Sequence, residues 1–203
     1  MLEELFEEIK LFLPKYLSTS QTKELFDSLS AYPNLPKHYL PPFALEDDVL
    51  QGDGWRGFVV INFFTLKKKT ISGVILSNSC DIDEQNRRAT PRNVLLAPLV
   101  SLMKYEEAMR AGGLTEAQIA DTLREIRAQR VTNIYHLPKK QYGPEESIIV
   151  LDDIHSHPLQ HFLTNQRSLI FRLHEAAFYI LLIKLSIHFC RVQEGVKRLP
   201  RSA

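Results

Sequence analysis

The sequence has little cysteine, almost no net charge and no long apolar run. Only Cys80 and Cys190 occur among 203 residues, too few for the disulfide framework of a small secreted domain. Lysine and arginine number 25 against 24 acidic residues, a net charge of +1, so the chain as a whole has no field that attracts nucleic acid or an anionic membrane. The most apolar run, residues 176–183, ends at Lys184, whereas a membrane span needs roughly 20 residues. These absences, with an acidic N-terminal stretch unlike a secretion signal, predict a cytoplasmic protein with free thiols and no membrane contact.

Hydrophobic residues make up 44% of the chain, enough for one globular domain with additions or for two small domains. Residues 2–13 repeat apolar side chains at helical spacing, and a second such stretch runs up to Pro33. Four prolines then interrupt regular structure. We therefore expect an N-terminal helical hairpin at residues 1–32 and a proline-rich connector at residues 33–48.

Short stretches rich in β-branched residues follow over residues 49–158. Their centres lie about ten residues apart, which is typical of antiparallel hairpins and of a small SH3-like barrel. Apolar side chains change to helical spacing at Ser101, and strand-like stretches return after residue 130. The prediction is an α+β fold: a small antiparallel β-barrel with a helical insertion at residues 101–130.

Residues 159–203 complete the chain as a predicted long helix, from about Asn165 to Gln193, with a basic tail. This helix is apolar on most of its circumference, so it needs cover on nearly every side. The N-terminal helices are one source of that cover. A partner protein or a second copy of the chain, bound through the C-terminal helix, is the other.

The segments "QGDGW", "KKKTISGVILSN" and "NVLLAPLVS", within residues 50–101, resemble the SH3-like barrel of the MazF/PemK-type growth-inhibitor toxins, which are ribonucleases. The matching positions are Gly52, Asp53, Leu76, Ser77, Pro98 and Ser101. The catalytic arginine of that family falls on Ile71 and its threonine on Val100. Neither replacement can supply charge or a proton to a phosphoryl-transfer transition state. The resemblance therefore implies the barrel and a bacterial toxin–antitoxin or phage-defence setting, but not the ribonuclease activity.

Cys80 and Asp81 follow a predicted strand in the stretch "GVILSNSCDID". A cysteine nucleophile needs a neighbour that lowers the pKa of its thiol, and an adjacent carboxylate acts in the opposite direction. Two interpretations stay open. The pair is catalytic, or Cys80 is a small residue beside a turn that polar side chains stabilise.

A second candidate site lies in "DDIHSHPLQH". His155 and His157 share one face of a strand because side chains alternate, and together with Asp153 they form a possible ligand set for a divalent metal. Zinc motifs normally contain two ligand pairs, and here there is one. Surface histidines and a capping role for Asp152 are the alternative interpretation.

Basic residues occur in two clusters, one in a predicted hairpin turn and one in the loop after Cys80. A groove for nucleic acid would need both clusters on one side of the fold, with aromatic side chains between them. Solvated turns that oppose aggregation are the alternative. The candidate nucleic-acid or partner-binding residues are Lys67, Lys68, Lys69, Arg87, Arg88 and Arg92.

Two functions follow from these patterns. The first is a non-catalytic bacterial interaction module that binds a protein partner or nucleic acid and calls for no cofactor. The second is a hydrolase or nuclease that uses Cys80 and Asp81 with Asp153, His155 and His157, through a thiolate or a divalent metal. A short distance between the Cys80 thiol and either imidazole would favour the enzyme.

Overall fold

The computed structural model describes residues 19–42, 48–62, 65–83, 85–86 and 89–190. The chain divides into two units, residues 1–36 and residues 37–203, and each is described by itself. The first unit contains helix α2 (Thr19–Ser30), which is the second helix of the expected hairpin. The expected helix at residues 2–13 and the basic tail lie outside the described residues.

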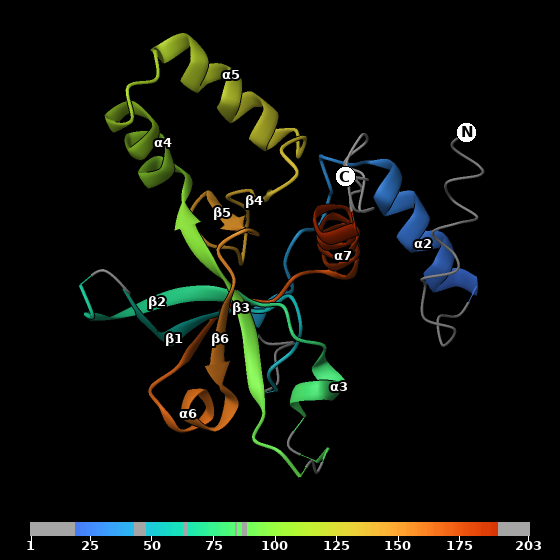
Figure 1. Cartoon of the computed structure of the whole chain (residues 1–203). Helices are drawn as coiled ribbons and strands as arrows, with labels where there is room; N and C mark the ends of the chain where they lie inside the picture. Colours follow the sequence, from blue (N-terminus) through green and yellow to red (C-terminus); the bar gives the residue numbers. More distant parts are fainter. Residues whose placement is uncertain (1–18, 43–47, 63–64, 84, 87–88, 191–203) are drawn as a thin grey trace, which may run out of the picture. The chain divides into compact units, whose positions relative to one another are not determined.

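The second unit contains seven strands in one antiparallel sheet. Strand β3 (Asn93–Ser101) is the longest, and it pairs with three neighbours in turn: β6 along its first half, β2 in the middle and β5 at its end (Figure 1). The order across the sheet is β4-β5-β3-β2-β1-β7. The other strands are β1 (Gly54–Ile61), β2 (Lys68–Ile75), β4 (Ile134–Leu137), β5 (Ser147–Val150), β6 (His155–Pro158) and β7 (Ser168–Phe171).

The expected α+β class is confirmed, but the sheet is not closed into a barrel. Strand β1 pairs with β7 only over Gly54–Arg56. A bulge at Gly57, with φ of +115°, then separates the two halves of β1. Beyond it, the Val59 N–H donates to the His157 ring nitrogen Nε2 at 3.4 Å in place of a strand-to-strand ladder. We call this opening between β1 and β6 the β1–β6 seam.

The helical insertion forms α4 (Leu102–Ala111) and α5 (Glu116–Arg127), as expected from the spacing of apolar residues. Thr115 begins α5 with a capping box to Gln118, which satisfies backbone N–H groups at the helix start. Side chains of both helices pack with Ile134 of β4 and Ile148 of β5 in one hydrophobic cluster. The insertion is therefore anchored on the outer strands of the sheet (Figure 1).

A second hydrophobic cluster fills the other end of the sheet. The Phe58 and Phe162 rings stack with their centroids 4.4 Å apart, and Trp55 meets Phe162 edge-on at 5.9 Å. Phe162 belongs to α6 (Leu159–Thr164), and Ile82 is added by the short helix α3 (Ser79–Ile82). This cluster fixes α6 against β1 and β3.

The C-terminal helix begins later than expected. Residues 168–171 form β7, and helix α7 spans Glu175–Cys190. The local apolar pattern of residues 165–174 fits a helix, but hydrogen bonding to β1 overrides it. None of the described helices is both long enough and apolar enough to cross a membrane.

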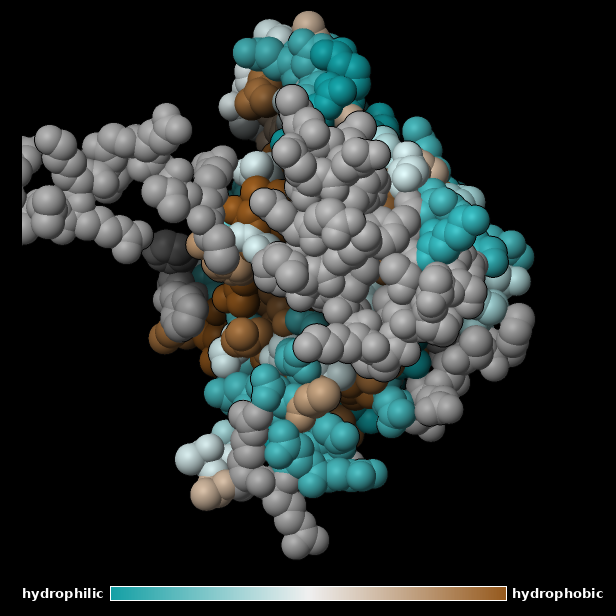
Figure 2. All heavy atoms as spheres, turned by 90° about the vertical axis from the view of Figure 1, so that its right-hand side faces the viewer, coloured by the Kyte–Doolittle hydropathy of each residue, from teal (hydrophilic) through white to brown (hydrophobic). Residues whose placement is uncertain are grey.

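Helix α7 packs on β4, where the Tyr135 hydroxyl donates to the Ala177 carbonyl oxygen at 2.9 Å. Its second half exposes Ile183, Ile187 and Phe189. Figure 2 shows brown, hydrophobic residues at mid-height on the face turned towards the viewer. Cover of this helix by a partner or a second copy stays a prediction.

A buried ion pair joins the start of β1 to the end of β7. The Arg172 guanidinium donates to both carboxylate oxygens of Asp53, at 2.8 to 3.1 Å, and to the Asp48 carbonyl oxygen at 2.7 Å. Burial raises the pKa of Asp53, and the contact with Arg172 opposes that effect. Asp53, one of the positions that match the toxin family, therefore has a structural role in this fold.

Candidate binding groove

A pocket of about 670 Å³ lies at the open end of the β1–β6 seam. One wall is the end of β1 and the other is the chain entering β6, with β2 and β3 beneath them. The start of α4 closes one side. The lining residues are Val60, Ile61, Asn62, Lys69, Ile71, Ser72, Pro98, Leu99, Val100, Ser101, Lys104, Asp153, Ile154 and His155.

The floor of this groove is apolar. It is formed by Val60 of β1, Ile71 of β2 and Pro98 and Val100 of β3. Ile71 packs against the Phe58 and Trp55 cluster, and Val100 packs against the cluster of α4 and α5. Val60, Ile71 and Val100 nevertheless stay partly exposed where they line the pocket. A partly exposed apolar floor of this kind can bury apolar side chains of a ligand.

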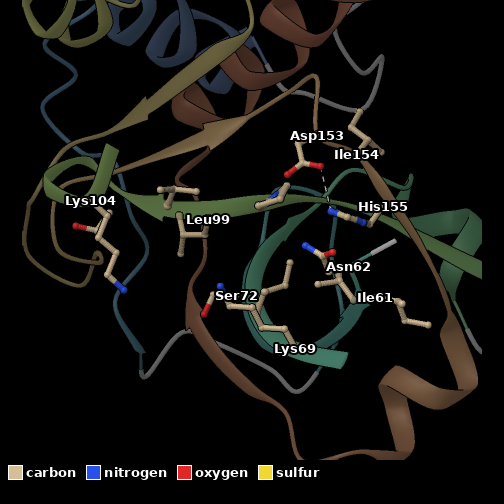
Figure 3. A pocket seen from close by; sticks show the side chains of 14 residues that line it. Ile61, Asn62, Lys69, Ser72, Leu99, Lys104, Asp153, Ile154 and His155 are labelled. Carbon is tan, nitrogen blue, oxygen red and sulfur yellow. Dashed lines mark ion pairs between the residues drawn. The ribbon is translucent and has the colours of Figure 1, made fainter. Parts of the chain in front are cut away.

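Polar groups stand at both ends of the groove (Figure 3). At one end the Asp153 oxygen Oδ1 lies 3.2 Å from the His155 nitrogen Nε2, with Asn62 nearby. Lys104 stands at the other end, and Lys69 extends from β2 between them. In the described part of the chain neither lysine ammonium forms an ion pair, so both can interact with a carboxylate of a ligand.

Cys80 lies on α3, away from these groups. It is exposed, its N–H donates to the Asn78 side chain at 2.9 Å, and its carbonyl oxygen accepts from Asn86 at 2.8 Å. Asp81 follows it on the exposed side of the same short helix. Within the described residues no imidazole contacts the Cys80 thiol, so the pair that a cysteine nucleophile requires does not form there.

The two candidate histidines share a face, as expected, because His155 pairs with Leu96 and His157 with Val94, both fully buried. Their surroundings differ. The His157 ring accepts from Val59 at Nε2 and lies 3.1 Å from the Pro158 carbonyl oxygen at Nδ1, and burial lowers its pKa. It is therefore a neutral, buried imidazole with both nitrogens used.

Asp153 and His155 remain as a pair without a third ligand from His157. Among the residues that the structure places, no three histidine, cysteine, aspartate or glutamate side chains come together as a metal site would require. What the sequence predicts correctly is the proximity of Asp153 to His155, two positions apart along the chain.

Of the two basic clusters, Lys67–Lys69 and Arg92 are described, and they lie towards opposite ends of β2. Lys67, Lys68 and Lys69 are exposed at its start, but only Lys69 lines the groove. The Arg92 guanidinium donates to the Asp83 and Asn86 carbonyl oxygens and so holds the loop before β3. Arg87 and Arg88 lie outside the described residues.

Sequence patterns do not reveal Lys104, Ser72 or Asn62 as groove residues. Lys104 has no basic neighbour in sequence, and it reaches the groove because α4 starts directly where β3 ends. The one sequence signal for Lys104 is that it is a polar residue in the first helical turn after a long predicted strand.

Ile71 and Val100, the positions where the resemblance lacks its catalytic residues, both line the groove. No protein-family model matches this sequence, and a search of curated proteins finds no match. The function therefore has to be inferred from the groove itself.

Proposed function

We propose that this protein is a non-catalytic interaction module whose groove binds an extended segment of a partner protein. Apolar side chains of the segment enter the floor over Ile71 and Val100, and its carboxylates pair with Lys69 and Lys104. The observation that carries the proposal is a partly exposed apolar floor with a lysine along it and another at its end. A toxin–antitoxin or phage-defence setting is part of the proposal only through the resemblance of residues 50–101.

A protein segment fits this groove better than a nucleic acid does. Single-stranded nucleic acids bind grooves that combine strong positive charge with aromatic side chains on which bases stack. The described lining contains no phenylalanine, tyrosine or tryptophan, and Asp153 offsets part of the charge of Lys69 and Lys104. Apolar contacts are then the main source of affinity, and they suit a peptide.

The hydrolase alternative depends on the Asp153–His155 pair, since a carboxylate that orients an imidazole is the arrangement of a general base. Ser72 and Ser101 line the same pocket. However, neither serine hydroxyl forms a hydrogen bond with His155 in the described part of the chain, so no nucleophile is activated. Hydrolysis of a chromogenic phosphodiester or ester by the wild type, lost in His155→Ala, would favour the enzyme over the binding module.

Selection of displayed peptides on the purified chain tests the proposed function. We expect enriched peptides in which apolar residues alternate along the chain and aspartate or glutamate flanks them. Lys69→Glu and Lys104→Glu should each weaken binding of an enriched peptide about fivefold to tenfold, because each replaces an attraction with a repulsion. Fluorescence anisotropy of the labelled peptide measures the change.

Lys68→Glu is the matched control. It makes the same charge change one residue earlier in β2, but Lys68 does not line the groove, so affinity should stay within about twofold. Equal losses of peptide affinity in Lys68→Glu and Lys69→Glu would show that binding depends on the overall charge of the protein and not on the groove. Failure to enrich any peptide, together with tight and salt-sensitive binding of single-stranded RNA, would replace the proposal with a nucleic-acid function.

A further inference from the structure

The backbone of β1 has one edge without a strand partner beside the groove. The Asn62 N–H donates to the Lys67 carbonyl oxygen at 3.0 Å and closes the β1–β2 hairpin. Hydrogen-bonded and non-hydrogen-bonded pairs alternate along an antiparallel ladder. Val60, opposite Lys69, therefore bonds to β2, whereas Val59 and Ile61 direct their N–H and C=O groups away from it.

The contact of Val59 with the neighbouring strand agrees with this orientation. Its N–H crosses the β1–β6 seam to the His157 ring rather than towards β2. Pairing with β7 stops at Arg56. From Phe58 to Ile61 no described strand forms a backbone ladder with this edge, and β6 contacts it through the His157 ring. Ile61 is 47% exposed, and its backbone faces the open seam where the groove lies.

We propose that the partner segment binds as a β-strand added to the Val59–Ile61 edge of β1, inside the β1–β6 seam. This inference rests on the proposed function and defines how the segment is recognised. The added strand exchanges backbone hydrogen bonds with Ile61 and with the Val59 carbonyl oxygen. Its side chain opposite Val60 points to the groove floor, because directly opposed residues share a face of the sheet.

The charges around the edge specify the occupant. Lys69 lies opposite Val60 on β2, and Lys104 stands at the end of the groove. A strand that places an apolar residue over Val60 and Ile71, with carboxylates near Lys69 and Lys104, complements both the floor and the charges. A basic or uniformly apolar strand would meet repulsion or leave the ammonium groups without partners.

Proline at position 61 isolates the backbone contribution. Ile61→Pro removes the seam-facing N–H and leaves the hydrogen bonds to β2 in place, as is tolerated at a sheet edge. Ile61→Ala removes a similar part of the side chain and keeps the N–H. With a peptide from the selection as probe, we expect Ile61→Pro to bind at least about tenfold more weakly than Ile61→Ala.

N-methylated peptides give a second measurement on the wild-type protein. Methylation of one backbone amide at a time should weaken binding at alternate positions and leave the positions between them unaffected, since only every second amide faces β1. Thermal unfolding of both variants monitors folding. If Ile61→Pro does not fold, the methylation pattern alone tests whether the peptide binds as an added strand.

The outcomes separate the two proposals. Equal binding by Ile61→Pro and Ile61→Ala, or no alternation among methylated peptides, would overturn strand addition but leave the peptide-binding groove intact. A wild-type chain that enriches no peptide would overturn both. Tenfold weaker binding by Ile61→Pro than by Ile61→Ala, together with alternating effects of peptide methylation, would support both the peptide-binding groove and strand addition.

Discussion

His38 is a buried imidazole in a mostly aromatic environment. It is 4% exposed, its ring lies 4.8 Å from that of Tyr39, and neither ring nitrogen has a hydrogen-bond partner in the described structure. Burial lowers its pKa from 6.5 to about 3, with smaller contributions from Lys140, His136 and His174. The folded chain therefore keeps His38 neutral at a pH where the unfolded chain protonates it.

This difference predicts acid sensitivity from one side chain. Between the unfolded pKa of 6.5 and the folded pKa of about 3, unfolding takes up a proton, so stability is complete above pH 6.5 and falls as the pH decreases. At pH 5 the loss should be about 2 kcal/mol. The free energy of unfolding is measured with urea at pH 7 and at pH 5. In His38→Phe the decrease between the two pH values should be smaller than in the wild type by the amount that His38 contributes.

Met103→Leu, at an exposed position and without a titratable group, serves as the comparison and should keep the wild-type pH dependence. An unchanged difference between the two pH values in His38→Phe would assign the acid sensitivity to other groups.

Residue-level prediction from sequence succeeds where partners are close along the chain. Asp153 and His155 meet because two strand positions separate them. Arg172 and Asp53 form the buried ion pair although 119 residues separate them along the chain, and no local pattern signals it. The low exposure of His157 is likewise set by Phe58 and β1, which come from distant sequence.

At the level of elements, Gln129 takes the place of a missing strand at the outer edge of β4. Just after α5, with φ of +59°, its side chain donates to the His136 carbonyl oxygen at 2.6 Å and accepts from the His136 N–H at 3.0 Å. The Lys184 ammonium of α7 donates to the same side chain at 2.9 Å. One amide group therefore connects α5, β4 and α7.

Gln129→Ala should destabilise the fold by about 2–3 kcal/mol. It leaves the backbone groups of His136 unpaired and removes a partner of the buried Lys184 ammonium, and unsatisfied buried groups cost about 1–3 kcal/mol each. Burial already lowers the pKa of Lys184 to about 8, and loss of this acceptor would lower it further. Urea unfolding measures the change.

Arg124→Ala on the exposed side of α5 is the control, with an expected change within about 0.5 kcal/mol. Faster hydrogen exchange at the His136 amide in Gln129→Ala would locate the damage at this edge. A loss no larger than that of the control would show that Gln129 is not what completes β4.

Elements with strong local periodicity are predicted well from sequence. The strand at residues 93–101 and the two helices of the insertion follow directly from the spacing of apolar residues. Strand β7 is missed because its conformation depends on β1, far away along the chain. The same reason explains the late start of α7.

At the level of the whole molecule, the sheet and both hydrophobic clusters belong to the second unit. All members of the two clusters lie between Val49 and Leu169, and all seven strands lie within residues 37–203. The composition and strand spacing predict this α+β organisation. Closure of the barrel is not predictable from them, because it depends on whether β1 and β6 meet.

A chain that begins at Lys37 should therefore keep a cooperative thermal unfolding transition, since every member of the two described clusters is retained. Circular dichroism at far-ultraviolet wavelengths follows the transition, with the full-length chain for comparison. A gradual melt without a transition would show that residues 1–36 are required for the sheet to fold.

Gly57 determines more than a local bend. A side chain at this position would meet the Gln166 carbonyl oxygen at 2.6 Å, so only glycine fits where β1 turns away from β7. Without this extra residue Phe58 would follow Arg56 directly, and the pairs Arg56–Ser72 and Phe58–Ile71 would form an uninterrupted ladder with unchanged faces. The bend and added twist by which the second half of β1 leaves β7 would be lost. The ability of this protein to accept a guest strand would thus depend on one extra residue that has no side chain of its own.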